Sequence, residues 1–194
     1  MESSLVSGLA FFLFIAGVLA YAAILYNGLV RLRNDNDRAW ANIDVLLKQR
    51  HDELPKLIET CKRYMQFEQE TLEKVMRARA SVSQASISGN IAAVGAAEQQ
   101  LRAGVGRLFA VAESYPQLKS DQTFKQLQTR ITALEESIAD RRELYNDQVN
   151  LNNIRVQVFP DVLIAHLGGF RPAQLLEFSG DEKRDVDVGA LFGT

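Results

Sequence analysis

The sequence is poor in the residues on which several classes of protein depend. Cys61 is its single cysteine, which excludes a disulfide within the chain and a cysteine-based zinc site. Four prolines and twelve glycines leave little room for low-complexity linkers. The two histidines, His51 and His166, lack a second ligand three or four residues away. We therefore predict no metal and no cofactor.

An excess of basic charge is also missing. The chain carries 22 Lys and Arg against 24 Asp and Glu, a formal net charge of -2. A broad nucleic-acid footprint needs a basic excess, so we predict no nucleic-acid partner.

Charge is absent altogether from Ser3 to Val30. The apolar run Leu5–Leu25 would span roughly 31 Å as a helix, enough for a hydrocarbon core of about 30 Å. A cleaved signal peptide is the alternative, but it would carry a basic start and a shorter apolar run. We predict a single-pass anchor over residues 1–26, with apolar side chains at Leu5, Phe11, Phe12, Phe14, Ile15, Leu19 and Leu25.

The flanking charges predict how this anchor is oriented. No Lys or Arg precedes it, whereas Arg31, Arg33 and Arg38 follow closely. The positive-inside rule then places the N-terminus outside and the large domain in the cytoplasm. Ala16 and Ala20 lie one turn apart and would let two anchors approach, as in a homo-oligomer.

After residue 30, apolar residues recur three and four positions apart, which is typical of amphipathic helices. This pattern predicts an all-α fold with four helices, near residues 27–51, 53–85, 89–114 and 121–158. Short connections favour an up-and-down four-helix bundle over residues 27–178. The first helix is expected to continue directly from the anchor, because no proline precedes residue 52. Residues 179–194 are predicted to form a flexible tail.

Local signals predict the breaks. Asp52 can cap a helix that has Pro55 in its first turn, although one continuous helix kinked at Pro55 is the alternative. Residues 86–90 read as a turn, and Ser120 or Asp121 as the cap of the last long helix.

This topology brings the segment after Phe159 back to the end of the bundle near the membrane. Residues 159–170, with Leu175, Leu176 and Phe178, are rich in apolar side chains. They either contact the lipid headgroups or complete the bundle core.

The residues supply no catalytic constellation. Cys61 lies on an apolar stripe with no base near it in sequence, and the acidic residues have Lys or Arg one helical turn away. There is no phosphate loop, nucleophile elbow or zinc-protease motif. We therefore predict no enzymatic activity.

Asparagine, a poor residue for helix interiors, recurs on the first and last predicted helices. One interpretation is a polar seam that fixes register or receives a partner; the other is amide-to-backbone bonding within the bundle end. The candidate seam residues are Asn27, Asn34, Asn42, Asn146, Asn150 and Asn153. Trp40 is interpreted as a core anchor rather than a binding residue.

The sequence resembles the LemA family along nearly its whole length. The first part of the resemblance comprises Tyr26–Asn34, Asp37–Trp40, Ile43–His51, Leu54–Thr60, Tyr64, Glu68 and Ala78–Ala80. The second comprises Tyr115–Lys119, Arg141–Asn146, Phe159–Pro160, Ile164–Ala165, Gly169–Phe170 and Phe178. The chain departs from the family pattern at Phe67, where relatives usually carry His, and at Cys61, where Val is more usual.

The resemblance implies a bacterial protein with one membrane helix and a four-helix bundle. It also implies an association with membrane proteases of the HtpX type. We expect a membrane-anchored interaction or scaffold protein in the bacterial cytoplasmic membrane. Its contact surface would be the asparagine seam or the loops at Tyr115–Asp121 and Gln49–Pro55. The alternative is an accessory subunit or regulator of a membrane protease, acting through the anchor and the segment near the membrane.

Overall fold

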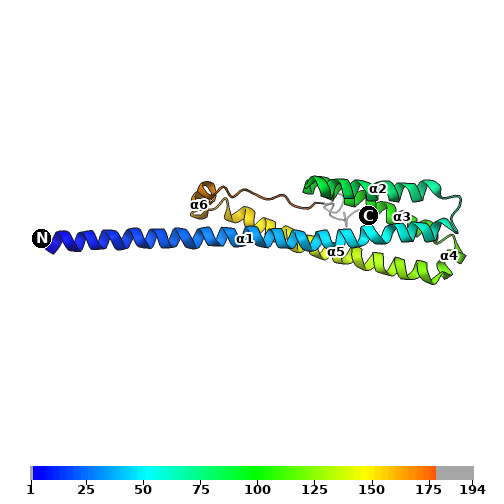
Figure 1. The fold of residues 1–194 in the computed structure, drawn as a ribbon, viewed down its shortest axis with the longest axis horizontal. Helices are drawn as coiled ribbons and strands as arrows, with labels where there is room; N and C mark the ends of the chain where they lie inside the picture. The colour runs from blue at the N-terminus through cyan, green and yellow to red at the C-terminus, as the bar shows by residue number, and fades with distance from the viewer. Residues whose placement is uncertain (1, 178–194) are drawn as a thin grey trace, which may run out of the picture. The chain divides into compact units, whose positions relative to one another are not determined.

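The computed structural model describes residues 2–177, and the regular elements in that part of the chain are all helices (Figure 1). This confirms the predicted all-α class. The predicted tail at 179–194 lies outside the described residues, as does Phe178. The helices are α1 (Glu2–Lys62), α2 (Gln69–Ser88), α3 (Ile91–Ala112), α4 (Pro116–Ser120), α5 (Gln122–Arg155) and α6 (Asp161–Gly168).

The predicted break at Asp52 is wrong, because α1 continues through Pro55 to Lys62. Proline lacks the N–H that would bond the carbonyl four residues earlier, here that of His51. Arg79 Nε on α2 donates a hydrogen bond of 2.9 Å to that carbonyl. The alternative of one continuous helix is therefore the correct one, and the first turn of the bundle falls at residues 63–68.

The other helix ends follow local chemistry. Gly89, in the left-handed region at φ 67°, ends α2, and the Asn90 side chain accepts a hydrogen bond from the Ala93 N–H to begin α3. Asp121, rather than Ser120, begins α5 by accepting from the Phe124 N–H at 3.0 Å. The short α4 inside the predicted loop was not expected. The predicted last helix is also too long, because α5 ends at Arg155 and a separate α6 follows.

The described residues form two compact units, and both α1 and α5 contribute to each. The first unit holds residues 2–40 and 144–173. The second holds residues 41–143 and 174–177. They are described separately below.

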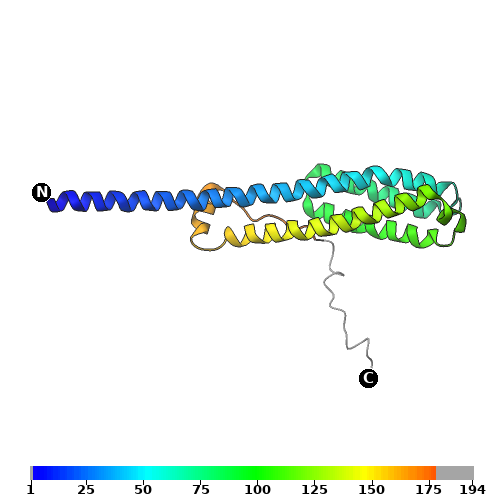
Figure 2. The ribbon, with the colours of Figure 1, turned by 90° about the horizontal axis from the view of Figure 1, so that it is seen from below.

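The second unit is a bundle of four helical segments. Figures 1 and 2 show the end of α1, α2, α3 and the start of α5 lying side by side. Side chains from all four segments are buried: Ile43, Leu47, Leu54, Leu57 and Ile58 of α1, Leu72, Val75 and Val82 of α2, Val94, Leu101, Val105 and Leu108 of α3, and Phe124, Leu127, Ile131 and Ile138 of α5. After α6 the chain passes α3, where a Cβ on Gly95 would clash with the Glu177 carbonyl oxygen. A glycine is needed at Gly95 because the backbones approach so closely.

The first unit combines the N-terminal part of α1, the end of α5, and α6. Leu29, Val156 and Ala165 form its small core, against which Ile164 and Phe170 are partly buried. The predicted core anchor Trp40 is half-buried, with its ring centroid 5.7 Å from that of Tyr145. Burial of this apolar surface fixes α5 and α6 against α1.

The N-terminal stretch of α1 has no such cover. By length and composition, α1 is the one helix of the described residues able to cross a membrane, and none of its most apolar stretch is buried. Six of the predicted anchor residues are exposed, and Leu25 is half-buried: the exposed ones are Leu5, Phe11, Phe12, Phe14, Ile15 and Leu19. A continuous apolar surface of this size needs a partner or a lipid phase.

Candidate interaction surfaces

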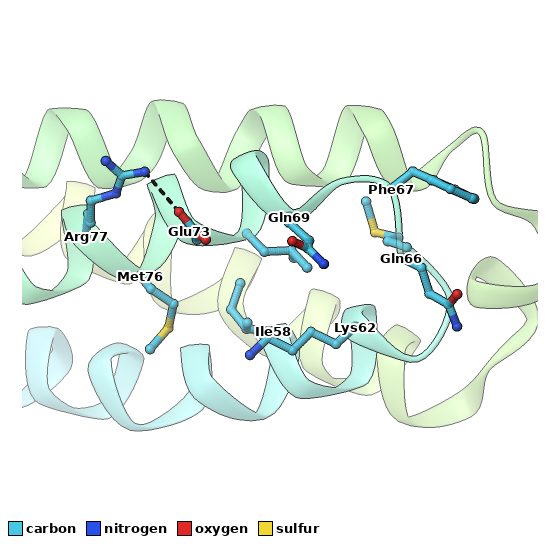
Figure 3. Close-up of a pocket in the computed structure, with 10 residues that line it drawn as sticks. Ile58, Lys62, Gln66, Phe67, Gln69, Glu73, Met76 and Arg77 are labelled. Carbon is cyan, nitrogen blue, oxygen red and sulfur yellow. Dashed lines mark hydrogen bonds and ion pairs between the residues drawn. The ribbon is translucent and has the colours of Figure 1, made fainter.

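A groove lies between α1 and α2 in the second unit (Figure 3). Its volume is about 840 Å³. Ile58, Met65 and Leu72 are buried beside it, and Figure 3 shows Ile58 and Met76 pointing into the space between the helices. Apolar side chains at the base of a groove between helices are suited to an apolar partner segment.

The rim of the groove is polar. Exposed side chains line it at Lys62, Gln66, Gln69, Glu73 and Arg77. Arg77 donates to Glu73 at 3.2 Å, a pair one helical turn apart on α2. A polar rim around an apolar base is the usual anatomy of a protein–protein contact surface.

Phe67 ends the groove and is 94% exposed. Its ring points away from the groove in Figure 3. An aromatic ring this exposed gains nothing from folding, whereas aromatic residues are enriched at protein contact surfaces. Phe67 is also one of the two positions noted above at which the sequence departs from the family pattern.

Hydrogen bonds tie the connection that holds Phe67 to the α4 region. The Tyr64 hydroxyl donates to the Asp121 carboxylate at 2.9 Å, and the Tyr115 hydroxyl lies 3.5 Å from Glu68. The bond to Asp121 raises the pKa of Tyr64 above its ordinary value. The pKa of Asp121 is lowered, first by the Phe124 N–H and then by the Tyr64 hydroxyl. Two connections far apart in sequence are thus joined into one surface.

A charged cluster lies inside the second unit, where sequence reasoning did not predict one. Arg50 of α1, 1% exposed, bonds the carboxylate of Glu98 on α3, which is 2% exposed, and that of Glu135 on α5 at 2.5 Å. Although burial opposes the charge, the two carboxylates raise the pKa of Arg50. Burial raises the pKa of Glu98, and Arg50 opposes that shift.

The sequence held a signal for this cluster. Glu98 interrupts the apolar stripe of α3, and Arg50 lies three residues after Leu47 and four before Leu54, within the apolar stripe of α1. A charge inside such a stripe is either exposed or paired. Pairing Arg50 with Glu98 sets one buried charge against the other, and it ties α1 to α3 at these two positions.

The candidate asparagine seam is scattered in the structure. Among its members, Asn27, Asn34, Asn42 and Asn150 are exposed, whereas Asn146 and Asn153 are half-buried. Two other asparagines, Asn36 and Asn152, are the buried ones.

Asn153 bonds the backbone that follows α6. Its amide nitrogen donates to the Ala173 carbonyl at 3.0 Å, and its oxygen accepts from the Ala173 N–H at 2.7 Å. The neighbouring Asn152 lies 3.5 Å from the Arg171 carbonyl. This is amide-to-backbone bonding, the second of the two interpretations. Recognition of a partner by the exposed members stays a prediction.

The predicted loop at Gln49–Pro55 is not a loop, since these residues lie inside α1. The Tyr115–Asp121 loop is present and contains α4. Of the two loop surfaces proposed from sequence, only the second therefore exists, and residues 63–68 take the place of the first.

The chemistry-bearing residues are spread apart. No group of three His, Cys, Asp or Glu residues that could hold a metal ion occurs among residues 2–177. Cys61 is buried, and burial raises its pKa to about 12. A thiol with such a pKa stays protonated at neutral pH and is a poor nucleophile.

Comparison with known proteins agrees with the resemblance seen in the sequence. The LemA family matches residues 39–189, which is most of the chain. The protein belongs to the LemA family. The match covers the described residues of the second unit and, in the first unit, residues 39–40 and 144–173; it leaves out the apolar part of α1.

Several relatives are similar over most of the chain. Magnetosome protein MamQ 2 of Paramagnetospirillum magneticum is 25% identical over 84% of this chain and 70% of its own length. Magnetosome protein MamQ of Magnetospirillum gryphiswaldense is 23% identical over 75% of this chain and 62% of its own. Protein LemA of Metamycoplasma hominis is 25% identical over 93% of this chain and 82% of its own.

Proposed function

We propose that this LemA-family protein is a membrane-anchored interaction protein without catalytic activity of its own. Its anchor is the N-terminal part of α1, and its contact surface is the groove between α1 and α2. The observation that carries the proposal is the juxtaposition of Phe67, 94% exposed, with an apolar groove whose rim is polar. The partner would insert an apolar segment there, with Met76 adapting to its shape.

The anchor would hold the groove between α1 and α2 in the vicinity of a membrane. The apolar stretch of α1 is uncovered within the chain, and a bilayer would cover it. The exposed Arg31, Arg33 and Arg38 favour a cytoplasmic position for the two helical units, in the cytoplasmic membrane of a bacterium.

Site-specific photocrosslinking tests the contact surface. A benzophenone side chain at Phe67, which adds a benzoyl group to the exposed native ring, would be activated in intact cells that express the full chain. We expect one crosslinked protein band that disappears when Met76→Lys places a charge in the groove. Met76 is half-buried on α2, so retained helicity and melting temperature would show that this variant still folds.

The same probe at Ile87 is the matched control, because Ile87 is 85% exposed at the opposite end of α2. Bands that are equal from Phe67 and Ile87, or that persist in the Met76→Lys variant, would contradict the proposal.

The second candidate is an accessory subunit or regulator of a membrane protease. One observation favours it: the whole apolar surface of α1 is open to a neighbouring transmembrane helix, with Ala16 and Ala20 offering a close approach. Replacing residues 5–25 by an unrelated transmembrane helix separates the two. Crosslinking from Phe67 that is unchanged supports the groove, and its loss supports lateral contact in the membrane.

A further inference from the structure

The outer surface of α6 is apolar, although nothing in the first unit covers it. Leu163 is 57% exposed and Leu167 84%, and Phe159, just before the helix, is 79% exposed. Leu163 and Leu167 are four residues apart and so lie on one side of α6, and Phe159 stands in the turn just before it. A helix on the surface of a soluble protein normally turns polar residues outward.

The inner surface of α6 is held firmly. Ala165 is buried, and Phe170 folds back onto Tyr26 of α1, with ring centroids 5.6 Å apart. Arg155 of α5 donates to both oxygens of Asp161 in the first turn, at 2.5 and 3.2 Å. The outward direction of Leu163 and Leu167 is therefore fixed by packing and by a partly buried ion pair.

The contacts of α6 on α1 fall just after the apolar run Leu5–Leu25. Tyr26 follows that run directly, and Leu29 lies about 6 Å farther along the helix axis than Leu25. The headgroup layer beyond each side of the hydrocarbon core is about 5–8 Å thick. When residues 5–25 span a bilayer, α6 therefore lies at the level of the headgroups.

The charges of the segment agree with this position. Between residues 159 and 173 the single acidic residue is Asp161, which is paired with Arg155. The other ionisable side chains are His166 and Arg171, both exposed. The exposed Arg31 of α1 lies about 9 Å beyond Leu25 along the helix axis. Basic and apolar side chains together are the combination that binds the surface of an anionic bilayer.

We propose that α6 is an interfacial membrane contact: Phe159, Leu163 and Leu167 insert among the lipid headgroups beside the point where α1 enters the bilayer. The proposal rests on the membrane anchoring proposed above. Its consequence is mechanical, because a second contact next to the anchor restricts the tilt of α1. The first unit would then be attached to the membrane at two points, the anchor in α1 and the outer surface of α6.

Depth-dependent quenching in vesicles tests this contact with the full chain. In a Cys61→Ala background, single cysteines at Leu167, Leu144 and Phe12 would each carry a polarity-sensitive fluorophore. The vesicles contain phosphatidylcholine and phosphatidylglycerol, with nitroxide either near the top or near the end of the acyl chain. Leu144 is the matched control: it is 52% exposed in the same unit, about 18 Å along α5 from Val156.

We expect the Leu167 label to show blue-shifted emission and stronger quenching by the shallow nitroxide than by the deep one. The Leu144 label should remain accessible to an aqueous quencher. The Phe12 label should be quenched most by the deep nitroxide, which reports the anchor independently.

Two outcomes would overturn the contact while leaving the anchor intact. In the first, Phe12 is quenched but the Leu167 label is reached by the aqueous quencher. In the second, the Leu167 label is shielded from the nitroxides and from the aqueous quencher, and the unlabelled Leu167→Cys variant forms a disulfide between two copies. A second chain would then cover α6. Absence of quenching at both Phe12 and Leu167 would overturn the anchoring itself.

Discussion

Arg79 of α2 donates a hydrogen bond of 2.9 Å to the carbonyl of His51, the carbonyl that Pro55 leaves without a partner inside α1. A proline in a helix interior normally kinks or ends the helix, in part because this bond is lost. Here a side chain of the neighbouring helix supplies the donor. The continuity of α1 therefore depends on α2. Burial is the main cause that lowers the pKa of His51, and the positive charge of the Arg79 guanidinium lowers it further.

Arg79→Ala should destabilise the second unit by about 1.5–3 kcal/mol, the range for a hydrogen bond that involves a charged group. Urea unfolding of the detergent-solubilised chain measures this loss. Arg77→Ala is the control. Arg77 lies two residues before Arg79 and makes an exposed ion pair with Glu73, so its loss should change stability by less than about 1 kcal/mol. Equal effects of the two substitutions would contradict the role assigned to Arg79.

Much of the fold could be predicted from periodicity. The apolar spacing gave the all-α class, and the Gly89–Asn90 turn and the Asp121 cap depend on local chemistry that a sequence displays. The continuation of α1 through Pro55 could not be predicted, because the compensating donor comes from a residue 28 positions away. Asp52 has a side chain that could cap a helix whether a helix begins there or continues through it, so its presence did not distinguish the two structures.

The candidate sites divide in the same way. Uncovered apolar residues such as Phe12 follow directly from composition, whereas the groove at Phe67 requires knowing that the turn falls at residues 63–68. The asparagines were recognised as unusual. Which of them are buried depends on how α1 and α5 are rotated about their axes. The sequence therefore did not show that Asn36 and Asn152 are buried while neighbouring asparagines are exposed.

Arg50→Met should destabilise the second unit by about 3–5 kcal/mol, because it leaves the Glu98 carboxylate buried without its partner. The double variant Arg50→Met with Glu98→Leu should recover much of this loss, since both charges are then gone. Urea unfolding of both variants decides the point. A double variant as unstable as Arg50→Met alone would show that packing, rather than the stranded charge, causes the loss.

The Arg50→Met variant should also show a specific pH dependence. Burial already raises the pKa of Glu98, and removing Arg50 removes the charge that opposes the shift. An acid whose folded pKa is raised binds its proton more tightly in the native state, so the variant loses stability as pH rises from the ordinary pKa of 4.5 through the raised value. The deficit relative to the unmodified protein should therefore shrink on acidification. A deficit independent of pH would contradict this reasoning.

Cys61 should react with maleimide only when the bundle opens. Its side chain is buried and its pKa is raised to about 12 by burial, so the thiolate that reacts is scarce and inaccessible at neutral pH. Mass spectrometry would follow labelling with and without denaturant. A cysteine placed at the exposed Ile87 in a Cys61→Ala background should react within the mixing time. Equally rapid labelling of native Cys61 would contradict its burial.

Asn153→Ala should release the segment that follows α6. The two bonds to Ala173 together are expected to contribute about 1–3 kcal/mol, so the Ala173 amide should exchange with deuterium faster in the variant. Asn150→Ala, at an exposed position on α5, serves as the control and should leave that amide protected. Unchanged protection in Asn153→Ala would assign the order of this segment to other contacts, such as the buried Leu176.

The central claim is that the apolar part of α1 holds the helical units on a membrane, and alkaline extraction of membranes tests it most directly. Alkaline carbonate strips peripheral proteins but leaves spanning helices in place. The full chain should remain in the membrane pellet, while a variant with Phe12→Arg and Leu13→Arg, which places two charges inside the run, should be released. Release of the unmodified chain into the supernatant would contradict the account.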